Sequence, residues 1–133
     1  MKTKNEAFWQ RKLSSEQYRV LRQKGTETPF SGKYLNHDKK GTYTCGACGA
    51  ELFSSDSKYE STTPGLTGWP SFGDVVNKGK VELKPDDSAG MYRTEVVCKS
   101  CGGHLGHLFE DGQSPTGQHY CINSCSLDFK PKP

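Results

Sequence analysis

The sequence predicts a mainly β protein in which two short helices precede an antiparallel β domain. Helix start and stop signals are confined to the first 25 residues, and short alternating runs separated by glycine and proline begin at about residue 41. Two CxxC pairs follow strand-like runs and could hold such a domain together. A length of 133 residues is typical of one domain. We therefore expect a single domain, 1–133, with a helical segment at about 5–25 and a β core at about 41–129.

The helical segment divides into two helices. An apolar stripe along residues 5–13 favours a first helix. Ser14 can cap a second helix, and Gln17 stands three residues later, which completes a capping box. Gly25 stands where that helix is expected to stop, because glycine accepts the left-handed conformation that is common at helix ends.

The β core shows the alternation that is typical of half-buried strands. MYRTEVVC (91–98) alternates most clearly, and Arg93 and Glu95 share one of its faces. The last strand-like run is HYCINSCSLDF (119–129). Its apolar residues fall on even positions before Asn123 and on odd positions after it, so we expect a bulge or a bend near that residue.

The composition predicts a small core that needs added support, and it argues against two classes of function. Only 32% of the residues are hydrophobic and 25% are charged, so a metal or disulfides are expected to add stability. The formal net charge is +3, and binding Zn²⁺ through four thiolates would lower it to +1, which argues against nucleic acid. We find no apolar segment long enough for a membrane helix and no apolar signal segment at the N-terminus. We therefore expect a cytoplasmic protein with reduced cysteines.

The CxxC pairs are the strongest motif that the residues alone provide. Each pair is followed by glycine, which lets the chain turn back after the second ligand, as in a zinc knuckle. Together the pairs predict one closed, structural Zn²⁺ site per chain. A redox CxxC, two disulfides, or another metal, chiefly iron, are the alternatives. The ligands would be Cys45, Cys48, Cys98 and Cys101.

Three further segments resemble a known family. TGWPSF (67–72), CGGHLGHLFEDG (101–112) and HYCINSCSLDF (119–129) are similar to the methionine-R-sulfoxide reductases of the B type, and the resemblance extends from about Thr26 to Phe129. It implies two antiparallel β-sheets stapled by the Cys₄ zinc site. It also implies an oxidoreductase, a peptide-methionine (R)-S-oxide reductase, which returns methionine-R-sulfoxide in peptides or proteins to methionine. Thioredoxin or another thiol would be the reductant, and the role would be protein repair under oxidative stress.

The resemblance places the catalytic cysteine at Cys121. Reduction of a sulfoxide by a thiol needs a thiolate that attacks sulfur. We therefore expect Cys121 to be partly exposed, with a pKa lowered by its neighbours. The products of the attack would be methionine and a sulfenic acid on this cysteine. A buried, inert cysteine in a strand is the alternative.

His104 and His107 are the candidates for protonating the departing oxygen, because histidine titrates near neutral pH. Residues three apart on a regular strand face opposite sides, so both rings can reach one pocket only if the strand bulges. Gly106 is a candidate position for this bulge. One histidine in the pocket and one structural histidine is the alternative. Asn123 shares the parity of Cys121 and could hydrogen-bond in the same pocket, or it could only make a turn.

Three aromatic residues are candidates for binding the substrate. Trp69 could grip the S-methyl group, because an indole face is flat, apolar and favours contact with sulfur, although an ordinary core position is the alternative. Phe109 could line the same wall, but for this residue the core is the favoured interpretation. His119 stands where the family usually has arginine. An imidazole can replace part of the charge and hydrogen bonding of an arginine, but only when it is protonated.

Two more departures from the family pattern concern the fate of the sulfenic acid and the rim of the pocket. Thr67 stands where many relatives carry a resolving cysteine, which leaves Cys125 as the internal candidate. However, four residues of a straight strand span roughly 13 Å, and a disulfide needs Cα atoms within about 7 Å. Direct reduction by an external thiol, or a buried Cys125 with some other route, are the alternatives. The inserted residues TTPGL (62–66) could reshape the pocket rim.

A zinc-knuckle binding module without catalytic activity is the competing function. For nucleic acid it would need a basic face or an aromatic platform, and the lysines and arginines are scattered along the chain. A purely structural zinc protein would leave the motifs HLGH and HYCINSC without a role.

Overall fold

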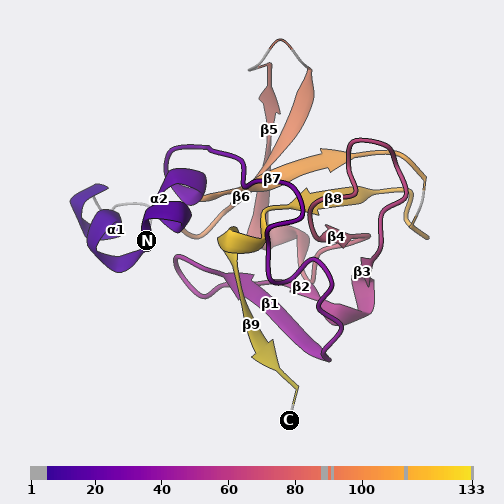
Figure 1. Cartoon of the computed structure of the whole chain (residues 1–133), viewed down its shortest axis with the longest axis horizontal. Helices are drawn as coiled ribbons and strands as arrows, with labels where there is room; N and C mark the ends of the chain where they lie inside the picture. The colour runs from indigo at the N-terminus through magenta and orange to yellow at the C-terminus, as the bar shows by residue number, and fades with distance from the viewer. Residues whose placement is uncertain (1–5, 88–89, 91, 113, 133) are drawn as a thin grey trace.

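The computed structural model describes residues 6–87, 90, 92–112 and 114–132. Two short helices accompany two antiparallel sheets, one of three strands and one of six (Figure 1). The predicted fold class, mainly β with two antiparallel sheets after short N-terminal helices, is confirmed. Within the described ranges, we find no helix of the length and apolar character needed to span a membrane.

The small sheet combines the first two strands of the chain with the last one, and the large sheet contains the six strands between them. The small sheet has the strand order β2-β1-β9, and the large sheet has the order β3-β4-β8-β7-β6-β5. The helices are α1 (Glu6–Lys12) and α2 (Ser15–Leu21). The strands are β1 (Gly41–Cys45), β2 (Glu51–Ser54), β3 (Lys58–Tyr59), β4 (Ser71–Phe72), β5 (Val81–Asp86), β6 (Arg93–Cys98), β7 (His104–Phe109), β8 (His119–Ile122) and β9 (Leu127–Pro131). Short 3₁₀ turns are η1 (Ser55–Ser57), η2 (Lys78–Lys80) and η4 (Ser124–Ser126).

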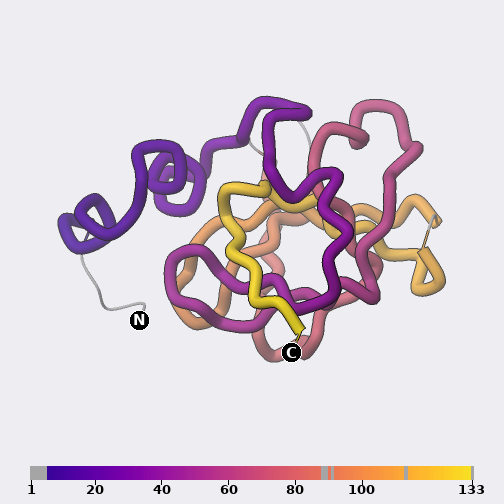
Figure 2. Tube along the Cα trace, turned by 60° about the horizontal axis from the view of Figure 1, so that its bottom comes forward, coloured from indigo at the N-terminus to yellow at the C-terminus, as the bar shows by residue number. Residues whose placement is uncertain are grey.

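The two helices lie to one side of the sheets (Figure 2). The predicted capping box is confirmed, because Ser14 Oγ accepts from the Gln17 N–H and the Gln17 side chain accepts from the Ser14 N–H. Trp9 is fully buried, and the Arg22 guanidinium lies over its ring. Arg22 also donates to the carbonyl oxygen of Cys101. The helices are therefore tied to the end of the large sheet that carries the second CxxC pair.

Aromatic and aliphatic side chains fill the core that joins the two sheets. Phe53 of β2 and Phe72 of β4 stack with ring centroids 4.5 Å apart, and Tyr43 of β1 meets Phe72 edge-on. All three are fully buried. Burial of one such side chain contributes roughly 1.5–3 kcal/mol. The core therefore fixes β4, and with it the neighbouring β8, relative to the small sheet.

The register of β7 and β8 decides which residues share a face at the centre of the large sheet. Cys121 of β8 stands opposite His107 of β7 and opposite Ser71 of β4. Between β7 and β6, both fully described, the register shifts so that Leu105 has no partner, which makes it the extra residue of a β-bulge. The predicted bulge between the two histidines is thus present, one residue before Gly106.

Gly106 is the point where the backbone of β8 comes closest to β7. A Cβ atom at this position would lie 2.1 Å from the carbonyl oxygen of Cys121 and 2.9 Å from the Cα of Ile122. These backbone atoms can move only if β8 shifts as a whole. Glycine is therefore required by the close approach of the two strands.

Gly106→Ala is expected to destabilise the protein by about 3 kcal/mol, because the added methyl group must push β8 away from β7. Urea titrations give the free energy of unfolding. Gly79→Ala is the matched control, since the nearest atom to a Cβ there is a side-chain oxygen of Asn77, at 3.2 Å. The control should change by less than about 1 kcal/mol. Equal losses in the two variants would contradict this account of the strand pairing.

Candidate active site

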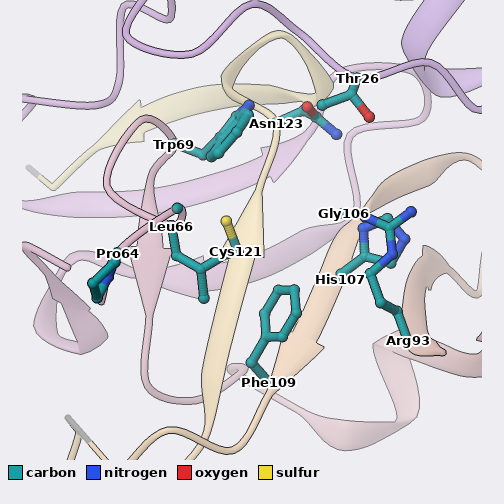
Figure 3. Close-up of a pocket in the computed structure, with 11 residues that line it drawn as sticks. Thr26, Pro64, Leu66, Trp69, Arg93, Gly106, His107, Phe109, Cys121 and Asn123 are labelled. Atoms are coloured by element: carbon teal, nitrogen blue, oxygen red, sulfur yellow. The ribbon is translucent and has the colours of Figure 1, made fainter. Parts of the chain in front are cut away.

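A cavity of about 460 Å³ opens beside β7 and β8 (Figure 3). Five of the predicted site residues line it: Trp69, His107, Phe109, Cys121 and Asn123. The remaining lining residues come from the insertion or were not assigned to the site from the sequence: Thr26, Pro64, Gly65, Leu66, Arg93 and Gly106. The cavity therefore joins the middle of the large sheet to two loops that lie far apart in the chain.

Cys121 lies at the centre of this lining, and its sulfur points into the cavity (Figure 3). The residue is only 9% exposed. Burial raises the pKa of the thiol to about 12, and the negative charges of Glu27 and Asp111 add to the effect. The expectation of a partly exposed thiol with a lowered pKa is therefore wrong for the protein without substrate. This shift favours the protonated thiol at neutral pH, and such a thiol would need a base in order to act as a nucleophile.

His107 is the cavity residue that can act as this base. It stands opposite Cys121 in the strand pairing, where Cβ atoms are typically about 5 Å apart. Its Nε2 lies 2.6 Å from Oδ2 of Asp86, and an ionised carboxylate can only accept, so Nε2 carries a proton. Burial lowers the pKa of His107 against the opposing effect of Asp86, which favours the neutral ring. In that ring Nδ1 is an acceptor, and it has no hydrogen-bond partner among the described residues.

Asp86 is a buried carboxylate that lies close to two cationic side chains. Lys24 Nζ lies 3.2 Å from its Oδ1, and Arg93 Nη2 lies 3.7 Å from its Oδ2. Arg93 stands opposite Asp86 in the pairing of β6 with β5, and it also lines the cavity. It therefore brings a positive charge to the site that was not anticipated from the sequence. The sequence places Arg93 and Glu95 on one face of β6, but only the pairing of β6 with β7 brings that face to His107.

His104 is buried next to His107, with ring centroids 5.4 Å apart. Its Nδ1 lies 2.7 Å from Oε2 of Glu95. Burial lowers the pKa of His104, and the hydrogen bond to Glu95 opposes this shift. The described cavity lining includes His107 and not His104. The bulge therefore brings the two rings together, but one of them reaches the cavity and the other supports it.

Trp69 forms one wall of the cavity, and its indole Nε1 donates to the carbonyl oxygen of Glu27 at 3.1 Å. Leu66 and Phe109 add apolar surface around the thiol (Figure 3). Phe109 is half-buried and belongs to the cavity, although the core was the favoured interpretation of this residue. Leu66 is part of the insertion 62–66, which contributes to the lining as expected.

Asn123 follows β8, and both the oxygen and the nitrogen of its side-chain amide form hydrogen bonds. Its Oδ1 accepts from the N–H of Glu27 at 3.0 Å, and its Nδ2 donates to the carbonyl oxygen of Leu105 at 3.1 Å. The residue is buried, yet it lines the cavity. An amide nitrogen carries two N–H groups, so Nδ2 has a second donor for a ligand.

His119 lies outside the described cavity lining and is fully buried. Its Nε2 lies 2.7 Å from Ser71 Oγ, and its Nδ1 lies 2.5 Å from Oδ2 of Asp111. The same Asp111 oxygen accepts from the hydroxyl of Thr63 in the insertion, at 2.9 Å. The structure therefore places His119 where it ties the strand of Cys121 to its neighbours and to the insertion, rather than on the cavity surface.

Cys125 lies in the 3₁₀ turn η4, so the predicted bend in this segment is confirmed. Its side chain lines a second cavity, of about 470 Å³, together with Glu16 and Gln17 of α2. Burial raises the pKa of the Cys125 thiol to about 12, and Glu27 adds to the effect. Cys121 and Cys125 therefore contribute to different cavities.

The four cysteines of the CxxC pairs come together where β1 and β6 end. Their sulfur atoms all lie within 4.8 Å of one another. Cys45 and Cys101 are 3.7 Å apart, and Cys48 and Cys98 are 3.5 Å apart, whereas a disulfide bond is about 2.05 Å long. Four thiolates at about 2.3 Å from Zn²⁺ would be about 3.8 Å from one another, so this donor set fits a tetrahedral zinc ion.

Comparisons with known proteins agree with this geometry. The family described as the SelR domain matches residues 13–131. A protein of Methanosarcina barkeri, named peptide methionine sulfoxide reductase MsrB, is 61% identical over 127 residues, which cover 96% of this chain and 87% of that protein. A protein of the same name from Leptospira interrogans is 56% identical over 127 residues, which cover 96% of this chain and 94% of that protein. The chain therefore belongs to the methionine sulfoxide reductase B family.

Proposed function

We propose that this protein is an oxidoreductase that reduces methionine-R-sulfoxide to methionine, with Cys121 as the nucleophile. The observation that carries the proposal is the pairing of Cys121 with His107 across two strands, in one cavity with apolar walls. Family membership supports the same reaction, because the relatives are named peptide methionine sulfoxide reductases. A zinc-knuckle binding module is not favoured, since it would leave this cavity without a role.

The reaction transfers one oxygen atom between two sulfur atoms. His107 takes the proton of the Cys121 thiol on Nδ1, and the thiolate attacks the sulfoxide sulfur. His107 then gives the proton to the oxygen as it moves to the cysteine. The attack forms a bond between the two sulfur atoms. This S–S bond and the S–O bond of the substrate then break as an S–O bond to Cys121 forms, so two electrons pass from the cysteine sulfur to the substrate sulfur. The products are methionine and a sulfenic acid on Cys121.

The groups around His107 support its two protonation states. Asp86 holds the ring by Nε2 and stabilises the imidazolium while His107 carries the extra proton. His104, held by Glu95, packs against the ring and keeps its orientation. The amide N–H of Asn123 is a donor for the sulfoxide oxygen.

The apolar wall would orient the substrate. The S-methyl group would lie against the indole of Trp69, with Leu66 and Phe109 completing the surface around it. A cavity of about 460 Å³ falls within the range of about 300–1,000 Å³ that is usual for small-molecule sites. The wall therefore excludes water from the sulfur atoms, while the open side admits a peptide that carries the oxidised residue.

Thiol-dependent consumption of a racemic methionine sulfoxide peptide tests the proposal. The native protein should consume half of the substrate, all of it the R epimer. Cys121→Ser should consume none, because a hydroxyl is a far weaker nucleophile than a thiolate. Circular dichroism spectra establish that both proteins are folded. No consumption by the folded native protein with its metal bound would refute the proposed function.

We also propose that Cys45, Cys48, Cys98 and Cys101 hold one structural Zn²⁺ per chain. The ion would join the end of β1 to the end of β6, and so the small sheet to the large one. Elemental analysis should give one zinc per chain. Removing the zinc with a chelator should lower the thermal midpoint by more than about 10 °C.

Two cysteine variants sharpen the zinc test. Cys48→Ala should lose zinc, whereas Cys125→Ala, at a cysteine outside the cluster, should retain it. Iron in place of zinc, or an unchanged thermal midpoint after complete removal of the metal, would contradict the assignment.

An external thiol, thioredoxin or another, would reduce the sulfenic acid on Cys121. This assignment is supported by the separate cavities of Cys121 and Cys125. Reduction would need two external thiols, which leave as a disulfide while the oxygen leaves as water.

Mass spectrometry after one turnover without reductant tests this route. The expected result is the gain of one oxygen atom on Cys121, because the Cys125 thiol lines a different cavity and would not form a disulfide with it. Cys125→Ala should give the same product and serves as the control. A loss of two hydrogens in the native protein, absent from Cys125→Ala, would instead identify Cys125 as the resolving cysteine.

We further propose a role in repairing oxidised proteins in the cytoplasm. None of the six cysteines, which all lie within the described ranges, forms a disulfide, and cysteines stay reduced in a reducing compartment. Thiol reductants that could return Cys121 to its reduced form are present in the same compartment.

A further inference from the structure

We propose that Glu27 is a positioning residue for the reaction, which holds the Trp69 wall, the Asn123 amide and the turn after β8 in one fixed arrangement. The inference rests on the proposed function, because it takes these groups to be those that meet the sulfoxide. Glu27 is only 4% exposed. It lines the cavity of Cys125, while its neighbour Thr26 lines the cavity of the nucleophile.

The main chain of Glu27 makes two hydrogen bonds to residues of the active-site cavity. Its carbonyl oxygen accepts from Trp69 Nε1 at 3.1 Å, and its N–H donates to Asn123 Oδ1 at 3.0 Å. Trp69 and Asn123 lie at the same end of the cavity (Figure 3). A displacement of residue 27 would therefore move two groups that are proposed to contact the substrate.

The carboxylate of Glu27 fixes this main chain by capping η4. Its Oε2 accepts from the N–H of Ser124 at 2.8 Å, and its Oε1 accepts from the N–H of Cys125 at 3.0 Å. The residue before a helical turn usually caps such N–H groups with its own side chain. Asn123 has that place, but in the described chain its side chain bonds Glu27 and Leu105 instead. Glu27 thus supplies the cap that leaves Asn123 for the cavity.

The negative charge of Glu27 also acts on the nucleophile. After burial, this charge is the largest contribution that raises the pKa of the Cys121 thiol, ahead of Asp111. It therefore favours the protonated thiol until His107 and a substrate are in place. The effect on the Cys121 pKa requires a negative charge at residue 27. The capping of η4 requires a side chain long enough to reach the N–H groups of Ser124 and Cys125. Substitutions of Glu27 can therefore separate the two effects.

Three variants make this separation. Glu27→Gln removes the charge and leaves one N–H of the turn unpaired, because an amide offers a single oxygen. Glu27→Asp keeps the charge but is one methylene shorter, so it cannot reach both N–H groups. Glu16→Gln, which removes an exposed carboxylate from the same second cavity, is the matched control. In a Cys125→Ala background with the metal bound, Cys121 is the thiol that remains for alkylation.

Two readouts are compared across the variants. With a methionine-R-sulfoxide peptide, kcat/KM should fall roughly tenfold to a hundredfold in Glu27→Gln and in Glu27→Asp, through a lower kcat and a higher KM. Glu16→Gln should stay within about threefold of the native value. The pH profile of alkylation of Cys121 by iodoacetamide should move to lower pH in Glu27→Gln alone, because losing the charge lowers the thiol pKa.

A native kcat/KM and an unchanged alkylation profile in folded Glu27→Gln would overturn the proposal. A fall in kcat/KM that parallels a fall in thermal midpoint, with no shift of the alkylation profile, would also overturn it and leave Glu27 a structural role. If the native protein reduces no sulfoxide, the proposed function fails. The alkylation profiles, which need no substrate, then still decide whether Glu27 acts on Cys121.

Discussion

The close approach of β8 to β7 at Gly106 is the constraint on which the site depends. The carbonyl oxygen of Cys121 occupies the space that a side chain at Gly106 would need, so the observed register of the two strands requires glycine at this position. This register sets Cys121 opposite His107 on one face of the sheet. A slip by a single residue would turn the thiol to the other face. In this register the proposed nucleophile faces the proposed base, and the bulge at Leu105 brings the second histidine against the first.

Burial determines the protonation states of Cys121 and His107 in the protein without substrate. Burial raises the pKa of Cys121 and lowers the pKa of His107, so both groups are neutral at pH 7. The site therefore does not have to bury an unpaired charge at rest, which would cost free energy. Asp86 and Glu95 lie behind the histidines and act in the opposite direction, so an imidazolium that forms during the reaction has a carboxylate partner. The site is thus arranged to create its ion pair when a sulfoxide oxygen is present to receive the proton. A thiol that is protonated at rest also reacts slowly with other electrophiles.

The features that depend on neighbours in the chain could be predicted from the sequence. The capping box, the bulge in β7 and the bend after β8 all follow from spacing or parity over a few residues. The cysteine cluster joins two distant segments, but the local spacing within each CxxC pair identified its four ligands. Cys121, which the family resemblance indicated as the nucleophile, and Trp69, in the family motif TGWPSF, both line the cavity. Arg93 and Asp86 could not be assigned to the site, because only the pairing of β5, β6 and β7 brings them to His107. The direction of the Cys121 pKa shift could not be predicted for the same reason, because it depends on burial and on the carboxylates of Glu27 and Asp111. The position of His119 also depends on tertiary contacts, since its ring is buried against Asp111.

The two histidines should contribute unequally to the proposed reaction, because His107 lines the cavity opposite Cys121 and His104 is buried beside the His107 ring. The rate of sulfenic acid formation in a single turnover, measured for His107→Gln and His104→Gln, tests this expectation most directly. His107→Gln should lower the rate by roughly 10²–10⁴-fold, the usual contribution of a positioned acid and base, and His104→Gln should lower it by about tenfold or less. Equal losses in the two variants, or the larger loss in His104→Gln, would contradict the account.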